Sequence, residues 1–150
     1  MGFFDQTSGD AATLAPLSRE RIEAVFQKKE WRYQVDSDGD LGGIWDDNLF
    51  YFFTAGERKE ILYIRGRWHH ALSIDQRNEA REVIDSWHLD RLWPKGYTRV
   101  DDDGQVRIFA ELVVDFENGV TDGQLTQTVM CGISTSIQLF EHLANHFGKG

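Results

Sequence analysis

The stretch from Val106 to Asp115 alternates between apolar and other side chains. Successive side chains of a β-strand point to opposite faces, so this spacing predicts a strand with one buried face. Such a strand needs paired neighbours and a cover for its apolar side, which means that the chain should fold around a sheet. The residues predicted to point inward are Val106, Ile108, Ala110, Leu112 and Val114. Those predicted to point outward are Arg107, Phe109, Glu111 and Asp115.

Other extended runs are separated by short segments rich in Asp, Asn and Gly, which favour turns. We expect strands at residues 31–35, 41–45, 49–54, 60–68 and 97–100, with turns at 36–40, 46–48, 55–59 and 101–104. In the run at 60–68, one face is predicted to carry Leu62, Ile64 and Trp68, and the other Tyr63, Arg65 and Arg67.

Helices are expected at residues 17–30, 74–92 and 121–147, where apolar side chains recur every three or four positions. Ser18 is the predicted N-cap of the first helix. Pro94 should end the second, because a proline disfavours helix in the residue before it. Thr121 and Gln124 have the spacing of a capping box at the start of the third.

The order helix, four strands, helix, two strands, helix predicts an α+β fold, a meandering antiparallel β-sheet with packed helices. The segment 1–16 is small and polar after its first residues and is expected to be a flexible leader. Residues 17–147 are expected to form a single domain, and residues 148–150 a frayed tail.

The chain of 150 residues carries 16 Lys and Arg against 25 Asp and Glu, a formal net charge of −9. This balance argues against a nucleic-acid partner, which normally meets a basic surface, and against docking on an anionic membrane. No run approaches the roughly 20 apolar residues of a bilayer span. The single cysteine, Cys131, excludes an internal disulfide and fits a reducing compartment, so we expect a cytoplasmic protein.

Two acidic clusters raise the question of a metal site. The Asp residues at 36, 38, 40 and 47 occupy positions of a calcium-loop template, but Leu41 stands where that loop needs glycine. The carboxylates of residues 101–103 are adjacent, and alternate side chains of an extended chain point apart. We expect both clusters to be solvated turns.

Other chemistry finds little support in the sequence. His142 and His146 would share one helix face and could hold zinc with a third ligand, but no such ligand stands nearby in the sequence. Cys131 lacks a catalytic signature, and no serine-nucleophile or phosphate-binding glycine motif occurs. We therefore expect no enzyme, no metal and no cofactor.

The predicted last helix has no charged residue from Gly123 to Phe140. Surface helices usually carry Lys and Glu on the side away from the core, so an uncharged polar side suggests partial burial there too. The cover could come from the same domain, from a second copy or from another protein. The side away from the apolar stripe carries Gln127, Cys131, Ser134, Thr135 and Gln138.

The side of the sheet away from the predicted core is a second candidate for partner binding. It should carry aromatic and arginine side chains, which are enriched at binding hot spots. The alternative is that helices cover this side, or that it is an ordinary solvent-exposed face. Its predicted members are Tyr63, Arg65, Arg67, Phe109 and Val113.

Several separated motifs resemble the YbjN-domain family. The central one runs from Ile84 to Lys95, with Tyr97 following, and two strand motifs lie upstream at 39–45 and 62–68. The segment from Asp115 to Gln127 is similar to the family's entry into the last helix. The resemblance covers residues 17–147 and departs from the family pattern at His88, where we would expect Asn.

The resemblance implies a fold like that of the type III secretion chaperones, α-β-β-β-α-β-β-α in outline. Those chaperones are small, acidic, non-catalytic proteins that bind extended segments of partner proteins, often as dimers. YbjN proteins themselves are described as candidate regulators of sensory transduction. The resemblance supplies no substrate.

Two functional hypotheses follow. The first is a non-catalytic, chaperone-like adaptor that binds an unidentified protein partner, with a homodimer left open. The second is a sensory regulator that binds a small molecule in a pocket lined by Trp68, Trp87 and Trp93. An enzyme would need a perturbed titratable pair in a cleft, and the sequence offers none.

Overall fold

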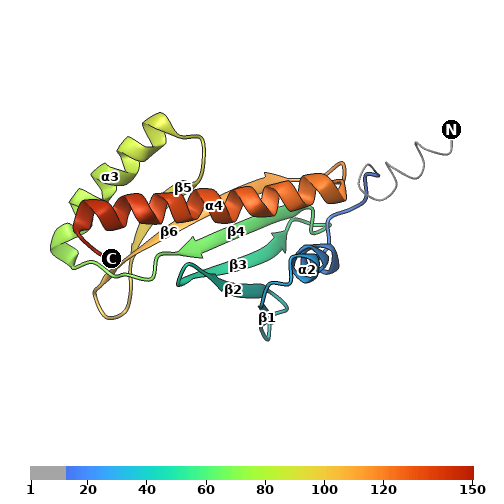
Figure 1. Cartoon of the computed structure of the whole chain (residues 1–150), viewed down its shortest axis with the longest axis horizontal. Helices are drawn as coiled ribbons and strands as arrows, with labels where there is room; N and C mark the ends of the chain where they lie inside the picture. Colours follow the sequence, from blue (N-terminus) through green and yellow to red (C-terminus); the bar gives the residue numbers. More distant parts are fainter. Residues whose placement is uncertain (1–12) are drawn as a thin grey trace.

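The computed structural model describes residues 13–150 and shows an α+β fold, as the sequence predicts (Figure 1). Six antiparallel strands lie in the order β1-β2-β3-β4-β6-β5. In chain order the elements are α2 (Arg19–Lys28), β1 (Gln34–Val35), β2 (Leu41–Trp45), β3 (Asn48–Ala55), β4 (Ile61–Arg67), the 3-10 turn η1 (Ile74–Gln76), α3 (Arg77–Asp90), β5 (Lys95–Val100), β6 (Val106–Asp115) and α4 (Asp122–Phe147). Four strands therefore stand between the first two helices.

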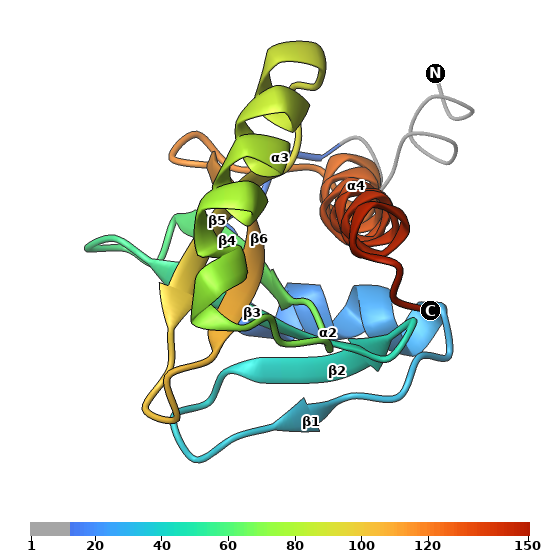
Figure 2. The same cartoon turned by 90° about the vertical axis from the view of Figure 1, so that its left-hand side faces the viewer.

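The helices α2, α3 and α4, which are the α-helices of residues 13–150, pack on one face of the sheet. Figure 2 shows the sheet bending around α4 and α2. The ring of Phe26 on α2 meets Phe52 on β3, with ring centroids 4.8 Å apart. On α4, the ring of Phe140 lies 6.4 Å from that of Phe50. These rings belong to one continuous core of buried apolar side chains.

Two glycines allow the helices to approach the sheet closely. A Cβ atom on Gly132 of α4 would stand 2.7 Å from the Cδ1 atom of Ile64 on β4. A Cβ atom on Gly96 of β5 would stand 3.0 Å from Leu139 and 3.1 Å from Ile84, on α4 and α3. Any larger residue would push these layers apart, because the interior is close-packed.

The helix starts follow the predicted caps. The backbone N–H of Arg21 donates to Ser18 Oγ at 3.2 Å. The Gln124 N–H donates to Thr121 Oγ1 at 3.0 Å, and the Thr121 N–H donates to Gln124 Oε1 at 3.1 Å. The second predicted helix is shorter than expected, since its first turn is the 3-10 turn η1 and its α-helix ends at Asp90.

One predicted turn residue is a buried strand residue. Asn48, expected in the turn 46–48, begins β3 and is only 1% exposed. Its side-chain amide donates to the carbonyl of Asp46 at 2.9 Å, and its Oδ1 accepts from the N–H of His69 at 2.9 Å. Because these bonds satisfy the amide, burial costs little.

Some residues of the predicted leader and tail make hydrogen bonds to the rest of the described chain. The leader was predicted at 1–16, of which residues 1–12 lie outside the described residues. Ala15 pairs with Val120, and the Arg21 guanidinium donates to the Ala15 carbonyl at 2.6 Å, so the last residues of the predicted leader are fixed. In the predicted tail, the Lys149 N–H donates to the Ala144 carbonyl at 2.8 Å after the left-handed Gly148, which closes α4.

Candidate partner-binding site

The sheet face opposite the helices is covered by no helix of residues 13–150. We call it the open face. Residues paired across adjacent strands share a face, so the strand register defines its members. Tyr51, Arg65, Glu111 and Lys95 form one row. The row on one side of it consists of Phe53, Tyr63 and Val113. The row on the other side consists of Arg67, Phe109 and Tyr97. Beyond that row, Arg107 and Arg99 form a further pair.

The sequence placed Tyr63, Arg65, Arg67 and Phe109 together, and all four lie half-buried on the open face. Val113, directly opposite Tyr63 on β6, is exposed. The structure therefore brings this predicted group into one surface. That this surface binds a partner stays a prediction.

The centre of the open face is an ion pair that the sequence did not single out. Arg65 Nε lies 2.7 Å from Glu111 Oε2, and the Tyr97 hydroxyl donates to the same oxygen at 3.3 Å. Glu111, expected on the outward side of β6, is only 7% exposed. The sequence could not predict that Glu111 is buried, because the burial depends on Arg65 and Tyr97 of the neighbouring strands.

Burial and charge shift two pKa values at this centre. Burial raises the pKa of the Tyr97 hydroxyl, and the charge of Glu111 raises it further. Burial alone would lower the pKa of the Arg65 guanidinium, but its hydrogen bond to Glu111 and nearby negative charge raise it overall. Both shifts keep the Arg65 guanidinium charged and the Tyr97 hydroxyl neutral at neutral pH.

Aromatic rings stack in pairs across the strands of the open face. Phe53 and Tyr63 have ring centroids 4.8 Å apart and planes 12° from parallel. Tyr97 and Phe109 are 5.4 Å apart and 14° from parallel. Arg65 lies 5.1 Å from the ring centre of Phe53, and Lys95 Nζ lies 5.5 Å from that of Tyr97. Each ring pair thus has a cation beside it.

Positive charge gathers on the open face although the chain is acidic. Arg99 on β5 faces Arg107 on β6 directly in the register. Arg107 Nε lies 3.6 Å from Asp101 Oδ2, whereas Arg67 and Arg99 have no carboxylate within 4 Å in the described part of the chain. The surface therefore offers unneutralised cations beside aromatic rings.

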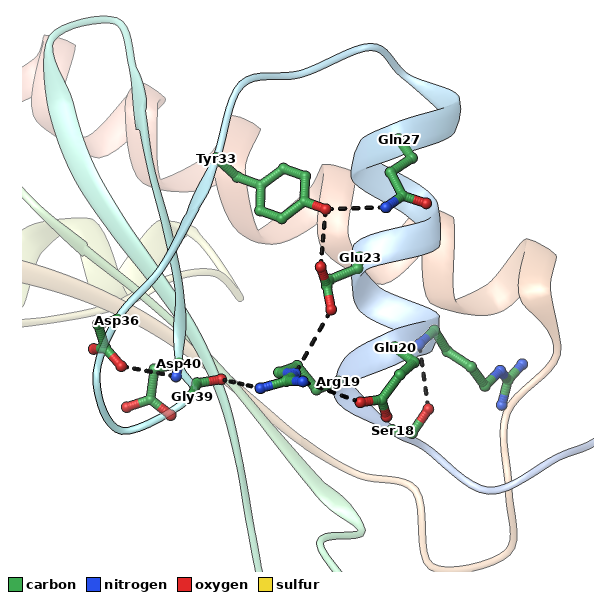
Figure 3. A network of polar contacts seen from close by, with 10 residues as sticks. Ser18, Arg19, Glu20, Glu23, Gln27, Tyr33, Asp36, Gly39 and Asp40 are labelled. Atoms are coloured by element: carbon green, nitrogen blue, oxygen red, sulfur yellow. Dashed lines mark hydrogen bonds and ion pairs between the residues drawn. The ribbon is translucent and has the colours of Figure 1, made fainter.

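The acidic hairpin 36–40 borders the open face and is tied to α2 (Figure 3). Arg19 of α2 donates to the Gly39 carbonyl at 3.4 Å and pairs with Glu23 at 3.6 Å. Glu23 in turn accepts from the Tyr33 hydroxyl at 2.9 Å. A hollow of about 240 Å³ joins the hairpin to the sheet and is lined by Asp36, Asp40, Tyr51, Phe53 and Arg65.

The two acidic clusters are turns, as predicted. Asp36 Oδ1 accepts from the backbone N–H groups of Asp38 and Asp40, both at 2.9 Å. In the second cluster, Asp101 Oδ1 accepts from the N–H groups of Asp103 and Gln105. Burial raises the pKa of Asp40, and the neighbouring Asp36 and Asp38 add to that rise.

The other predicted group, on α4, lies on a different surface. Gln127, Ser134 and Gln138 are exposed, and Cys131 is half-buried. This uncharged side of α4 is therefore only partly covered by the rest of residues 13–150. Within residues 13–150, no cover from the same domain reaches the three exposed residues, and a second copy or another protein remains open. Burial raises the pKa of the Cys131 thiol.

The predicted zinc pair faces α3 instead of a metal. His146 Nε2 lies 2.6 Å from Glu79 Oε2, and the ring of His142 is 5.4 Å from that of Trp87. Among residues 13–150, no three His, Cys, Asp or Glu side chains gather closely enough to hold an ion.

The three tryptophans of the predicted pocket differ widely in exposure. Trp68 and Trp87 are core side chains, 1% and 6% exposed, whereas Trp93 beyond the end of α3 is 48% exposed. The larger grooves described for residues 13–150 are lined by other side chains. Trp68 and Trp87 therefore serve packing in the core, and these grooves give no support to a pocket shared by the three tryptophans.

Comparison with known proteins identifies the family. A family model described as "YbjN: Putative bacterial sensory transduction regulator" matches residues 18–145. The chain belongs to the YbjN family. That description names a regulator and not an enzyme. None of the curated proteins matches the chain.

Solved structures share the YbjN-like fold at low identity. The crystal structure of YbjN from E. coli, titled "a putative transcription regulator", superposes with a TM-score of 0.73 and 10% identity, covering 91% of this chain and 96% of that one. An uncharacterized protein from Methanothermobacter thermautotrophicus superposes with a TM-score of 0.61 and 12% identity, covering 87% and 99%. Within residues 13–150, no helix is both long and apolar enough to cross a bilayer.

Proposed function

We propose that this chain is a non-catalytic, cytoplasmic adaptor, regulatory or chaperone-like, that binds a protein partner through the open face. The observation that carries the proposal is the composition of that face. Five aromatic rings and five cations lie on one helix-free surface of a chain with a net charge of −9. Aromatic and arginine side chains dominate the energetics of protein interfaces.

A protein partner is favoured over a small molecule because the face is broad and shallow. The hollow beside Arg65 has about 240 Å³, below the usual range of roughly 300 to 1,000 Å³ for small-molecule sites. At the centre of the face, Arg65 and Tyr97 both engage the Glu111 carboxylate, so these three polar side chains are already paired with one another. Binding is therefore the chemistry that the open face supports.

Site-specific photo-crosslinking in native cells tests the proposal. A benzophenone amino acid replaces Val113 on the open face, and the matched control replaces Asp75 of the 3-10 turn η1, which is also exposed. We expect a discrete adduct from position 113 that the control lacks, and an Arg67→Glu change should weaken it. Absence of any adduct specific to position 113 would overturn the proposal.

The uncharged side of α4 is proposed as a second docking surface, for another copy or for the partner. An uncharged, exposed helix side suits an interface core, where charged residues are depleted. Light scattering over a range of protein concentrations distinguishes these occupants. A stable dimer that Ser134→Glu dissociates would assign the surface to a second copy. A monomer at all concentrations, with a crosslink from position 134, would assign it to the partner.

A further inference from the structure

β5 forms one free edge of the sheet, since β6 is its only partner strand among residues 13–150. The N–H of Gly96 donates to His88 Nε2 at 2.9 Å, so the backbone groups of Gly96 point away from β6. Backbone groups alternate in direction along a strand, and those of Thr98 and Val100 therefore point the same way. Neither N–H has an acceptor within residues 13–150.

A groove runs between this edge and α3. It has a volume of about 330 Å³ and is lined by Arg81, Ile84, Asp85, Gly96, Tyr97 and Thr98. The groove leaves room for side chains of an extended segment laid beside Thr98. At the start of β5, the Gly96 N–H already donates to His88. An added strand would therefore not pair with Gly96, and the paired segment would be short.

The open-face side of β5 presents unbalanced charge. Arg99 faces Arg107 across the strand pair, and like charges directly opposite each other are destabilising. Asp101 pairs with Arg107, and within residues 13–150 no carboxylate pairs with Arg99. A carboxylate placed beside Arg99 would relieve this repulsion. Two positions away on the same side, Tyr97 offers an aromatic surface.

We propose that the β5 edge binds an extended acidic segment of the partner protein as an added strand. Its backbone pairs with Thr98 and Val100, an apolar side chain lies beside Tyr97, and an Asp or Glu two residues away lies beside Arg99. Such strand addition takes its affinity from main-chain bonds and its specificity from alternate side chains. The inference rests on the proposed function and names the partner's chemistry.

A polypeptide fits this edge better than a nucleic acid. Strand pairing needs alternating N–H and C=O groups, which a phosphodiester backbone does not have. The net charge of −9 also opposes a polyanion at long range.

A displayed library of random peptides, selected on the full chain, tests the sequence prediction. We expect enriched peptides to carry Asp or Glu two positions from an aromatic or aliphatic residue. Enrichment of peptides without this spacing would overturn the proposal, as would no enrichment at all. A labelled thymidine oligonucleotide is tested in parallel, and its binding at β5 in place of peptide would equally overturn it.

Variants of Thr98 test the backbone pairing with the best enriched peptide. Thr98→Pro removes an outward N–H but no bond to β6, whereas the control Thr98→Ala keeps that N–H. We expect Thr98→Pro to weaken binding about tenfold and Thr98→Ala less than about twofold. Arg99→Gln should weaken it about fivefold and reduce its salt dependence. If Thr98→Pro and Thr98→Ala bound the peptide equally well, strand addition would be contradicted.

Amide hydrogen exchange of the unmodified chain provides a measurement that needs no variant. The Thr98 and Val100 amides should exchange rapidly in the free chain and become protected when the enriched peptide is bound. Unchanged exchange would overturn the proposal. A crosslink from position 113 without these β5 effects would leave the proposed function standing and refute only the added strand.

Discussion

Arg65 and Glu111 lie directly opposite each other on the adjacent strands β4 and β6, and Arg65 Nε lies 2.7 Å from Glu111 Oε2 on the open face. The carboxylate is almost fully buried, while the guanidinium is about one-third exposed. A buried charge tolerates the loss of its partner poorly. The pair therefore links the stability of the sheet to the surface proposed to bind the partner.

Glu111→Ala should destabilise the chain by about 1–3 kcal/mol, because it leaves Arg65 and the Tyr97 hydroxyl without their shared acceptor. Urea unfolding of the two single variants and the double variant with Arg65→Met measures the coupling. We expect a coupling energy of about 0.5–2 kcal/mol, near the lower value if solvent screens the one-third-exposed guanidinium. Additive single effects would show that the contact contributes nothing.

Tyr97 should ionise at higher pH than an ordinary tyrosine, since burial and the Glu111 charge both raise its pKa. Its contribution to stability is fully present below the unfolded pKa of about 10 and is lost as the pH rises through the folded pKa. The absorbance of tyrosinate, compared between the native chain and Tyr97→Phe, isolates its titration. In Glu111→Gln the midpoint should move down, and an unmoved midpoint would exclude the carboxylate as a cause.

Gly132→Ala should destabilise the fold by about 1–3 kcal/mol through overpacking, because the added methyl meets Ile64 on β4. Gly123→Ala is the matched control in the first turn of the same helix, where the residue is exposed. The control should be neutral or stabilising by up to about 1 kcal/mol, since alanine favours helix. Thermal unfolding of both variants measures the difference, and equal effects would refute the close approach.

Cys131 should react slowly with a thiol reagent at neutral pH, because burial raises the pKa of its thiol. The thiolate is the reactive form, so the rate should climb steeply above about pH 9 in the folded chain. A disulfide-exchange reagent followed by absorbance measures this, with the urea-unfolded chain as the reference. A folded chain that reacts as fast as the unfolded one would contradict the burial.

The sequence predicted most of the fold because its strands and helices have strong periodic patterns. The strands at Leu41–Trp45 and Val106–Asp115 lie at their predicted bounds, and the caps at Ser18 and Thr121 form as expected. Local signals of this kind need no knowledge of long-range contacts. Asn48 was misplaced for the same reason, since only its distant partner His69 makes a buried position favourable.

The candidate site was predicted in part. Alternation along β4 and β6 placed Tyr63, Arg65, Arg67 and Phe109 on one side, and the structure agrees. Alternation could not show that α4 lies on the opposite side of the sheet, which separates Cys131 and its neighbours from that group. Nor could it show that Glu111 is buried by Arg65 and Tyr97, because that depends on which strands become neighbours.

The positive charges of β5 also bear on how copies of this chain meet one another. Unprotected sheet edges tend to aggregate, and charged side chains are a common safeguard. If two copies paired antiparallel through β5, Lys95 and Arg99 of one copy would stand near the same cations of the other. The β5 edge of one copy should therefore repel the β5 edge of another copy at high concentration. Salt that screens this repulsion should lower the solubility of the chain.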